Sequence, residues 1–286
     1  MARSQHAAIF CKARREFTGG IAQVSVVKFL SFWQELYDAR FVLRELVRQQ
    51  LILRYRRTVF GYFWTLFNPL LMMSVTAVVF STIFKMDLKT YAIFLFAGMI
   101  PFTYFSSTVT QSGQALVGNE GLIKKIYIPR LLFPLSIAIA LLIDSILTAI
   151  ALLIIIFVIG GKPTTALLFI PMAYFLLFVF TIGVAQIMAI CTVYFRDLQH
   201  IVGVLMQALL FLTPIFYKPE ALTGKVTWVI AVNPLTQFVE LFRRPIYGGE
   251  LPPLATISVA AIISAASLVI GLWFFRRHEN NVIFRL

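Results

Sequence analysis

The sequence predicts an all-α integral membrane protein: six transmembrane helices, an interfacial amphipathic helix before them, and short re-entrant or interfacial helices before the last span. Of its 286 residues, 60% are hydrophobic and only 13% are charged, with a mean hydropathy of +0.87. Soluble domains are about 45–50% apolar. The apolar runs reach about 20 residues, which is typical of spanning helices rather than barrel strands. The net charge of +13 is expected to orient the chain in the membrane, not to bind nucleic acid.

The N-terminal part precedes the membrane domain. Residues 1–35 contain a basic region without a following apolar core and cleavage site, so they are expected to form a cytoplasmic tail and not a signal peptide. Residues 36–57 predict an amphipathic helix that lies at the interface, either as an anchor or as a docking element. Its apolar arc comprises Leu36, Ala39, Leu43, Leu46 and Val47. Residues 58–286 then form the transmembrane domain.

The first span is Gly61–Phe84, which contains 24 residues without a formal charge. At about 1.5 Å of rise per residue, it is long enough to cross a hydrocarbon core of roughly 30 Å. The basic stretch from Arg54 to Arg57 holds its start on the cytoplasmic side. Pro69 cannot donate a backbone hydrogen bond, so we expect it to interrupt this helix near its first third.

Five further spans are expected. Pro101 is predicted to interrupt the second span, and the fifth is short and ends at Pro214. Six spans place both termini on one side, and 18 of the 25 Lys and Arg residues fall on that side. The positive-inside rule therefore places both termini in the cytoplasm. The five spans are Tyr91–Ser112, Leu131–Ile159, Thr165–Tyr194, Ile201–Phe216 and Leu254–Phe275.

Two polar segments separate these spans. Residues 113–130 would face the cytoplasm, and a short helix there would expose Leu122 and Ile123 beside Lys124 and Lys125. This segment is either an ordinary interfacial loop or a docking helix for a partner. Residues 217–253 hold apolar pieces too short to span, broken by Pro and Gly. That pattern predicts re-entrant or interfacial half-helices.

The sequence offers little that is typical of enzyme chemistry. Asp144 lies near the middle of the third span, where an ionised carboxylate is costly and must face protein or water, or be protonated. The spans hold no second acid or His to continue a relay, so a hydrogen-bonding role is favoured over proton transfer. The chain lacks a Gly-x-x-x-x-Gly-Lys-Ser/Thr motif, and its three His are scattered. We therefore expect no catalytic residue, cofactor or metal.

Several motifs together resemble one family. Arg54-Tyr55-Arg56-Arg57, Gly61-Tyr62, Trp64 and Asn68-Pro69-Leu70 look like the start of the first span in polysaccharide-exporting ABC-2 type permeases. Those subunits export O-antigen, capsule or teichoic acid, and all three cargoes share the pattern. Leu122-Ile123-Lys124-Lys125, followed by Tyr127, Pro129 and Arg130, is similar to the family's loop that inserts into an ATPase subunit. The resemblance covers roughly Leu36 to the end.

The resemblance implies a homodimer in the bacterial cytoplasmic membrane, driven by two copies of a separate P-loop ATPase. Its substrate would be a lipid-linked polysaccharide such as an O-antigen. The same resemblance implies two short helices near the outer mouth and an ATPase-coupling loop. The coupling candidates are Glu120, Leu122, Ile123, Lys124, Lys125 and Tyr127. The outer-mouth candidates are Asn233, Pro234, Gln237 and Phe238.

A sugar channel would use rings that stack on the apolar faces of pyranoses. An interfacial aromatic belt accounts for rings near span ends equally well. Trp64 and Asn68 share a helix face in the first span, because they lie one turn apart. The channel candidates are Tyr55, Tyr62, Trp64, Asn68, Phe102 and Tyr104.

Two other functions stay open. A membrane-embedded transferase acting on lipid-linked glycans would need acids or histidines clustered at a span end. A proton-coupled secondary transporter would need more intramembrane ionisable groups and an internal repeat. The sequence shows neither feature.

Overall fold

The computed structural model describes residues 39–55, 64–126, 128–158, 164–218, 230, 232–282 and 285, and these residues form helices and turns without any strand. Five of the helical segments are long and apolar enough to cross a membrane. The prediction of an all-α integral membrane protein is confirmed. The five are α3 (Trp64–Phe84), α4 (Leu88–Ser112), α6 (Leu132–Val158), α7 (Ile170–Tyr194) with the preceding turn η3 (Thr165–Phe169), and α11 (Leu254–Val282).

A sixth crossing is made by the shorter apolar helix α8 (Leu198–Leu212) and the residues after it. At one end, the side chain of Gln199 contacts that of Gln114, just after α4 ends. At the other end, the Tyr91 hydroxyl near the start of α4 donates to the Phe216 carbonyl over 2.9 Å. Residues 198–216 therefore run along the whole of α4, which agrees with the predicted short fifth span.

Two expectations about helix boundaries were wrong. α3 and α4 run through Pro69 and Pro101 without a break. Each proline removes one backbone hydrogen bond, but a transmembrane helix persists because unwinding in lipid would leave several backbone groups unsatisfied. α11 also continues beyond Phe275 to Val282. Its 29 residues span about 43 Å, so it is longer than the hydrocarbon core is thick.

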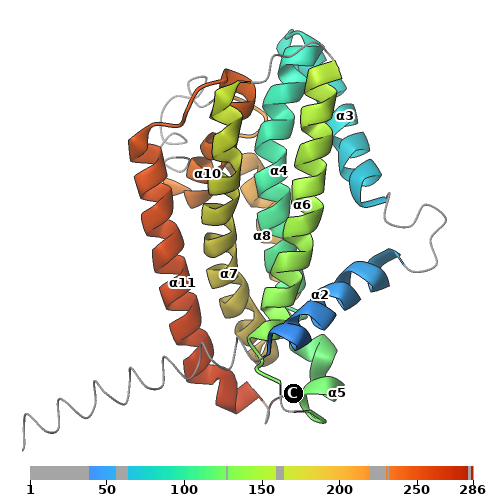
Figure 1. Ribbon diagram of the computed structural model, residues 1–286, viewed down its shortest axis with the longest axis vertical. Coiled ribbons are helices and arrows are strands. Elements are labelled where there is room, and N and C mark those ends of the chain that lie inside the picture. Colours follow the sequence, from blue (N-terminus) through green and yellow to red (C-terminus); the bar gives the residue numbers. More distant parts are fainter. Residues whose placement is uncertain are drawn as a thin grey trace, which may run out of the picture. The chain divides into compact units, whose positions relative to one another are not determined.

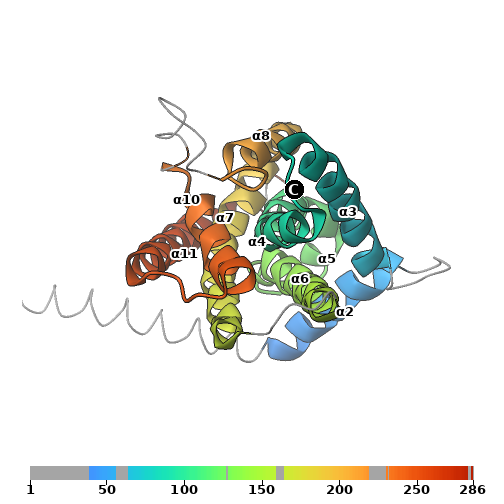
Figure 2. The same ribbon diagram turned by 90° about the horizontal axis from the view of Figure 1, so that it is seen from above.

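α4 is the central helix of the bundle. It packs against α3, α6, α7, α8 and α10 (Pro234–Arg243), as the view along the bundle shows (Figure 2). In the apolar window of α4, 67% of the residues are buried, against 17% for α3 and for α11. Asp87 caps its start, where Oδ2 accepts from the Thr90 amide over 3.1 Å. This hydrogen bond lowers the pKa of Asp87.

The most extensive helix pair is α7 with α11, which stand side by side in Figure 1. Ser264 donates to the Leu176 carbonyl over 2.8 Å, and Ser267 donates to the Phe180 carbonyl over 2.9 Å. Where the helices come closest, a Cβ atom on Gly183 would collide with the backbone of Ser267. Small residues let two backbones approach in this way, and interhelical hydrogen bonds then hold them.

The helix α2 (Arg40–Tyr55) forms within the segment predicted to be amphipathic. Arg40, Arg44 and Arg48 recur every four residues along it, so they share one face. Its position at a membrane interface stays a prediction. The predicted tail over residues 1–35 lies outside the described residues.

We predict that Gly183→Ala weakens the fold. The added methyl group meets backbone that cannot swing aside, and overpacking of this kind costs roughly 1–3 kcal/mol. Thermal unfolding of the purified protein in detergent measures the loss. Gly203→Ala is the matched control, because a Cβ atom there meets nothing within 4 Å. Equal melting temperatures for the two variants would contradict a close α7–α11 contact.

Candidate functional site

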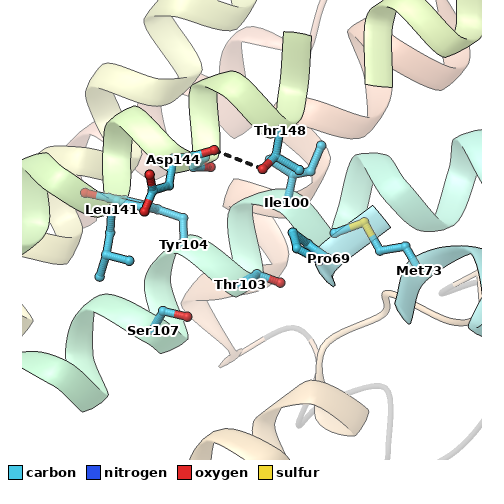
Figure 3. A pocket seen from close by; sticks show the side chains of 10 residues that line it. Pro69, Met73, Ile100, Thr103, Tyr104, Ser107, Leu141, Asp144 and Thr148 are labelled. Atoms are coloured by element: carbon cyan, nitrogen blue, oxygen red, sulfur yellow. Dashed lines mark hydrogen bonds between the residues drawn. The ribbon is translucent and has the colours of Figure 1, made fainter. Parts of the chain in front are cut away.

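A cavity of about 130 Å³ lies between α3, α4 and α6. Figure 3 shows its side chains converging from these three helices. Hydroxyl and carboxyl groups contribute to part of the wall, and apolar side chains cover the remainder. A volume of this size accommodates about four waters at their liquid density. The lining residues are Pro69, Met73, Ile100, Thr103, Tyr104, Ser107, Leu141, Asp144, Ser145 and Thr148.

Asp144 is the one acidic residue in the wall of this cavity. Thr103 and Ser107 contribute hydroxyls from α4, one helical turn apart. Thr148 donates to the backbone carbonyl of Asp144 over 2.9 Å. An intramembrane carboxylate requires polar groups or water beside it, and the hydroxyls of this partly polar cavity supply such groups. The structure therefore places the predicted lone acid against a space that can hold water or hydroxyl groups.

α3 separates this cavity from an exposed surface. Met73 is buried and lines the cavity together with Pro69. Trp64, which is 41% exposed, and Asn68 lie on the exposed side of the same helix. The Trp64 ring meets Phe67 edge-on, with the ring centroids 6.3 Å apart. The two channel candidates that the structure describes on α3 are thus both accessible.

The remaining channel candidates are placed differently. Phe102 and Tyr104 are buried in the bundle, and the Tyr104 hydroxyl donates to the Ala138 carbonyl over 3.3 Å. Neither ring faces the outer surface of the protomer, although Tyr104 contributes to the cavity wall. Tyr62 and the side chain of Tyr55 lie outside the described residues.

The predicted docking segment forms two short turns, η2 (Val117–Asn119) and α5 (Glu120–Ile123). Lys124 Nζ lies 2.6 Å from Glu120 Oε1, and this ion pair lowers the pKa of Glu120. Leu122 and Ile123 are half-buried, and Lys124 and Lys125 are exposed. Tyr127 lies outside the described residues. The segment thus offers apolar and basic side chains together, and its docking role stays a prediction.

The outer-mouth candidates belong to α10, one of the half-helices predicted before the last span. Asn233 caps α10: its Oδ1 accepts from the Leu235 amide over 3.0 Å, and its Nδ2 donates to Thr213 over 2.9 Å. Pro234 occupies the first turn, where its missing N–H costs nothing. Phe238 is fully buried and stacks on Phe180, and Gln237 is half-buried. Asn233 and Phe238 therefore fix α10 in place.

Arg243, at the end of α10, was not among the predicted site residues, because it was counted only as one of the charges of residues 217–253. Its side chain is only 4% exposed. The guanidinium lies over the Phe94 ring, with Cζ 3.9 Å from the ring centroid, and Nη2 donates to the Ile215 carbonyl over 3.2 Å. Glu240 Oε1 lies 3.6 Å from Nη1. A Cβ atom on Gly98 would be 2.8 Å from Nη2, so a larger residue at this position of α4 would displace the guanidinium.

The signal for this burial was present in the sequence. Arg243 follows Leu235 and Val239 at intervals of four, so it lies on the apolar face of α10. Both of those residues are buried. A helical reading of residues 234–243 would have placed the arginine in the bundle.

A bundle of apolar helices with a partly polar cavity inside it and a half-helix at one end is the architecture of a helical integral membrane protein. Residues 42–247 match the family model of the ABC-2 type transporter. That match covers more than half of the chain, which therefore belongs to the ABC-2 type transporter family. As a member, it is a transmembrane permease subunit.

Curated relatives extend this similarity along the chain. An O-antigen export system permease protein from Myxococcus xanthus is 29% identical over 243 residues, which cover 82% of this chain and 94% of the relative. A protein of the same description from Klebsiella pneumoniae is also 29% identical, over 85% of this chain and 92% of the relative. A polysialic acid transport protein from Escherichia coli is 26% identical, over 85% and 97%.

We predict that Arg243→Ala lowers the free energy of unfolding by roughly 2–4 kcal/mol, because it removes a charged hydrogen bond and leaves Glu240 without its buried partner. Arg243→Lys is expected to restore little, since an ammonium lacks the planar fork that stacks on Phe94. Arg244→Ala is the control: it faces the same Glu240 but is 43% exposed in its side chain, and should cost under about 1 kcal/mol. Thermal unfolding in detergent measures the stability of each variant. Equal losses of stability for both alanine variants would refute the prediction that Arg243 anchors α10.

Proposed function

We propose that this chain is the channel-forming subunit of an ABC transporter that exports a lipid-linked polysaccharide, of the O-antigen type, across the bacterial cytoplasmic membrane. The observation that carries this proposal is the near full-length match to permeases named for O-antigen export and polysialic acid transport. The sequence contains no P-loop, so ATP hydrolysis requires a separate partner chain.

The conduit is proposed to form between two copies of the chain. A polymer rich in hydroxyl groups needs a continuous protein path through hydrocarbon, and a two-fold axis is the usual symmetry of a dimer. α3 is the proposed wall, because Trp64 and Asn68 present a ring and an amide on its exposed side. Its apolar window is only 17% buried in the single chain, so most of this helix is available to face a second copy. The polar cavity behind it gives α3 space in which to shift.

The end of the bundle that carries α5 is proposed to face the cytoplasm. Lys124, Lys125 and Arg130 lie there, as do Arg196 and the last turns of α11. The positive-inside rule favours this orientation. The apolar and basic side chains around α5 would then meet the ATPase.

We predict that changing Leu122 and Ile123 together to Asp uncouples the complex. Two carboxylates placed in a buried contact without partners are costly, so the variant should reach the membrane but lose ATPase co-purification and surface polysaccharide. The host deleted for this chain and complemented with each variant provides the assay. Gly118→Asp is the control, because it adds an acid to the same segment where a Cβ atom meets nothing within 4 Å. Normal export by the double variant would exclude docking at α5, and failure of the wild-type chain to restore polysaccharide would exclude the proposed function.

We predict that Trp64→Ala reduces export while expression and ATPase binding stay normal, because the ring stacks on the moving glycan. Trp64→Phe should restore part of the export, since it retains an aromatic face. Surface polysaccharide per copy of permease is the measurement. Trp273→Ala on α11, another exposed tryptophan, is the matched control and should export normally. If Trp64→Ala exports as well as this control, the ring is only an interfacial anchor.

A further inference from the structure

We propose that Arg130 is a positioning residue that couples the docking loop, residues 113–130, to the C-terminal turns of α11. The proposal rests on the proposed docking of an ATPase at this loop. Arg130 stands where the loop enters α6: the Leu132 amide donates to the Pro129 carbonyl over 3.0 Å, and the Phe133 amide donates to the Arg130 carbonyl over 3.2 Å. Its backbone therefore moves with both elements.

The Arg130 side chain reaches an element 149 residues away in the sequence, where Nη1 donates to the Glu279 backbone carbonyl. Glu279 lies in the last described turn of α11, which runs to Val282. A cation is also favoured at the negative end of the helix dipole. Arg130 thus caps α11 from the docking loop, with a charge-assisted hydrogen bond.

The capped turns are also held to the end of α7. The Tyr194 ring meets His278 edge-on at 6.1 Å between centroids, and Arg285 Cζ lies 4.5 Å from the centroid of the Tyr194 ring. Val282 is fully buried. The loop, the end of α7 and the end of α11 therefore meet at one end of the bundle, and Figure 1 shows α5 and the last turns of α11 at this end.

This junction gives the docking loop a second connection to the bundle. The chain itself joins the loop to α4 and α6, whereas Arg130 joins it to α11. α11 and α7 cannot slide easily past each other, because their backbones meet at Gly183 and Gly271. A displacement of the loop consequently moves α7 and α11 together with α4 and α6. Without Arg130, α7 and α11 would follow the loop only through the packing of α7 against α4 and α6.

The test is Arg130→Ala in the assembled complex with its ATPase. We expect normal co-purification and continued ATP hydrolysis, with about a tenfold loss of polymer exported per ATP, the factor that one charged hydrogen bond can supply. Arg277→Ala is the matched control: it removes an exposed arginine from the same helix end, where Cζ lies 5.6 Å from the Trp273 ring centroid, and it should export normally. Wild-type export per ATP by Arg130→Ala would overturn the proposal.

A distance measurement separates coupling from a general loss of stability. Spin labels at Lys125 and Asn281 should keep one distance distribution when nucleotide binds to the wild-type complex, and should separate in Arg130→Ala. Identical distributions in both proteins would overturn the proposal. Val282→Asp should detach the same turns of α11 from the bundle and therefore reduce export. Adding Arg130→Ala to Val282→Asp should cause no further loss of export. If the two substitutions reduce export independently, the two residues do not act through one junction.

Two further results decide the remaining cases. If Arg130→Ala fails to insert in the membrane, Arg130→Lys provides the test, because lysine keeps the charge and a single donor group. Intermediate export per ATP by Arg130→Lys would support the proposal, and unchanged export per ATP would overturn it. Failure of the wild-type chain to export polysaccharide would instead contradict the proposed function.

Discussion

The close contact between α7 and α11 is the interaction on which the other contacts of the bundle depend. Lipid is as apolar as leucine, so helices in a membrane associate through backbone approach and interhelical hydrogen bonds. Gly183 and Gly271 supply the first, and Ser264 and Ser267 supply the second. α7 then offers its other faces: Tyr174 contacts Ser145 of α6, and Phe180 stacks between Phe105 of α4 and Phe238 of α10. One fixed pair thereby positions three further helices.

α3 differs from α7 and α11 in how it contacts the rest of the bundle. It contributes Pro69 and Met73 to a polar cavity, and most of its apolar side chains are exposed. α3 contacts α4 and α6 through side chains that border this cavity, whereas α7 meets α11 through backbone atoms at Gly183 and Gly271. The same cavity gives Asp144 a polar environment, which an acid near the middle of a span needs. The positions of the small residues on α7 and α11, and of the polar groups beside α3, therefore account for the different contacts of these helices.

The sequence allowed prediction of the elements whose signal is local. Long apolar runs marked the spans, and Pro and Gly among short apolar pieces marked the half-helix α10. The Pro69 and Pro101 interruptions were wrong because a bilayer penalises unwinding more than one missing hydrogen bond. Arg243 was assigned to a loop because charge was counted without the helical period that places it beside Val239. The cavity and the Arg130 contact join residues that are far apart in the chain, so no local pattern reveals them.

Arginine side chains fasten both ends of the bundle by the same chemistry. Arg243 donates to the Ile215 carbonyl just beyond α8, and Arg130 donates to the Glu279 carbonyl near the end of α11. Each donates to a backbone carbonyl near the end of a helix. They differ in burial, since Arg243 is enclosed by Phe94 and Gly98 whereas Arg130 is half-buried beside exposed lysines. The enclosed arginine holds α10 against α4. In the coupling that we propose, the accessible one transmits a movement of the docking loop to the end of α11.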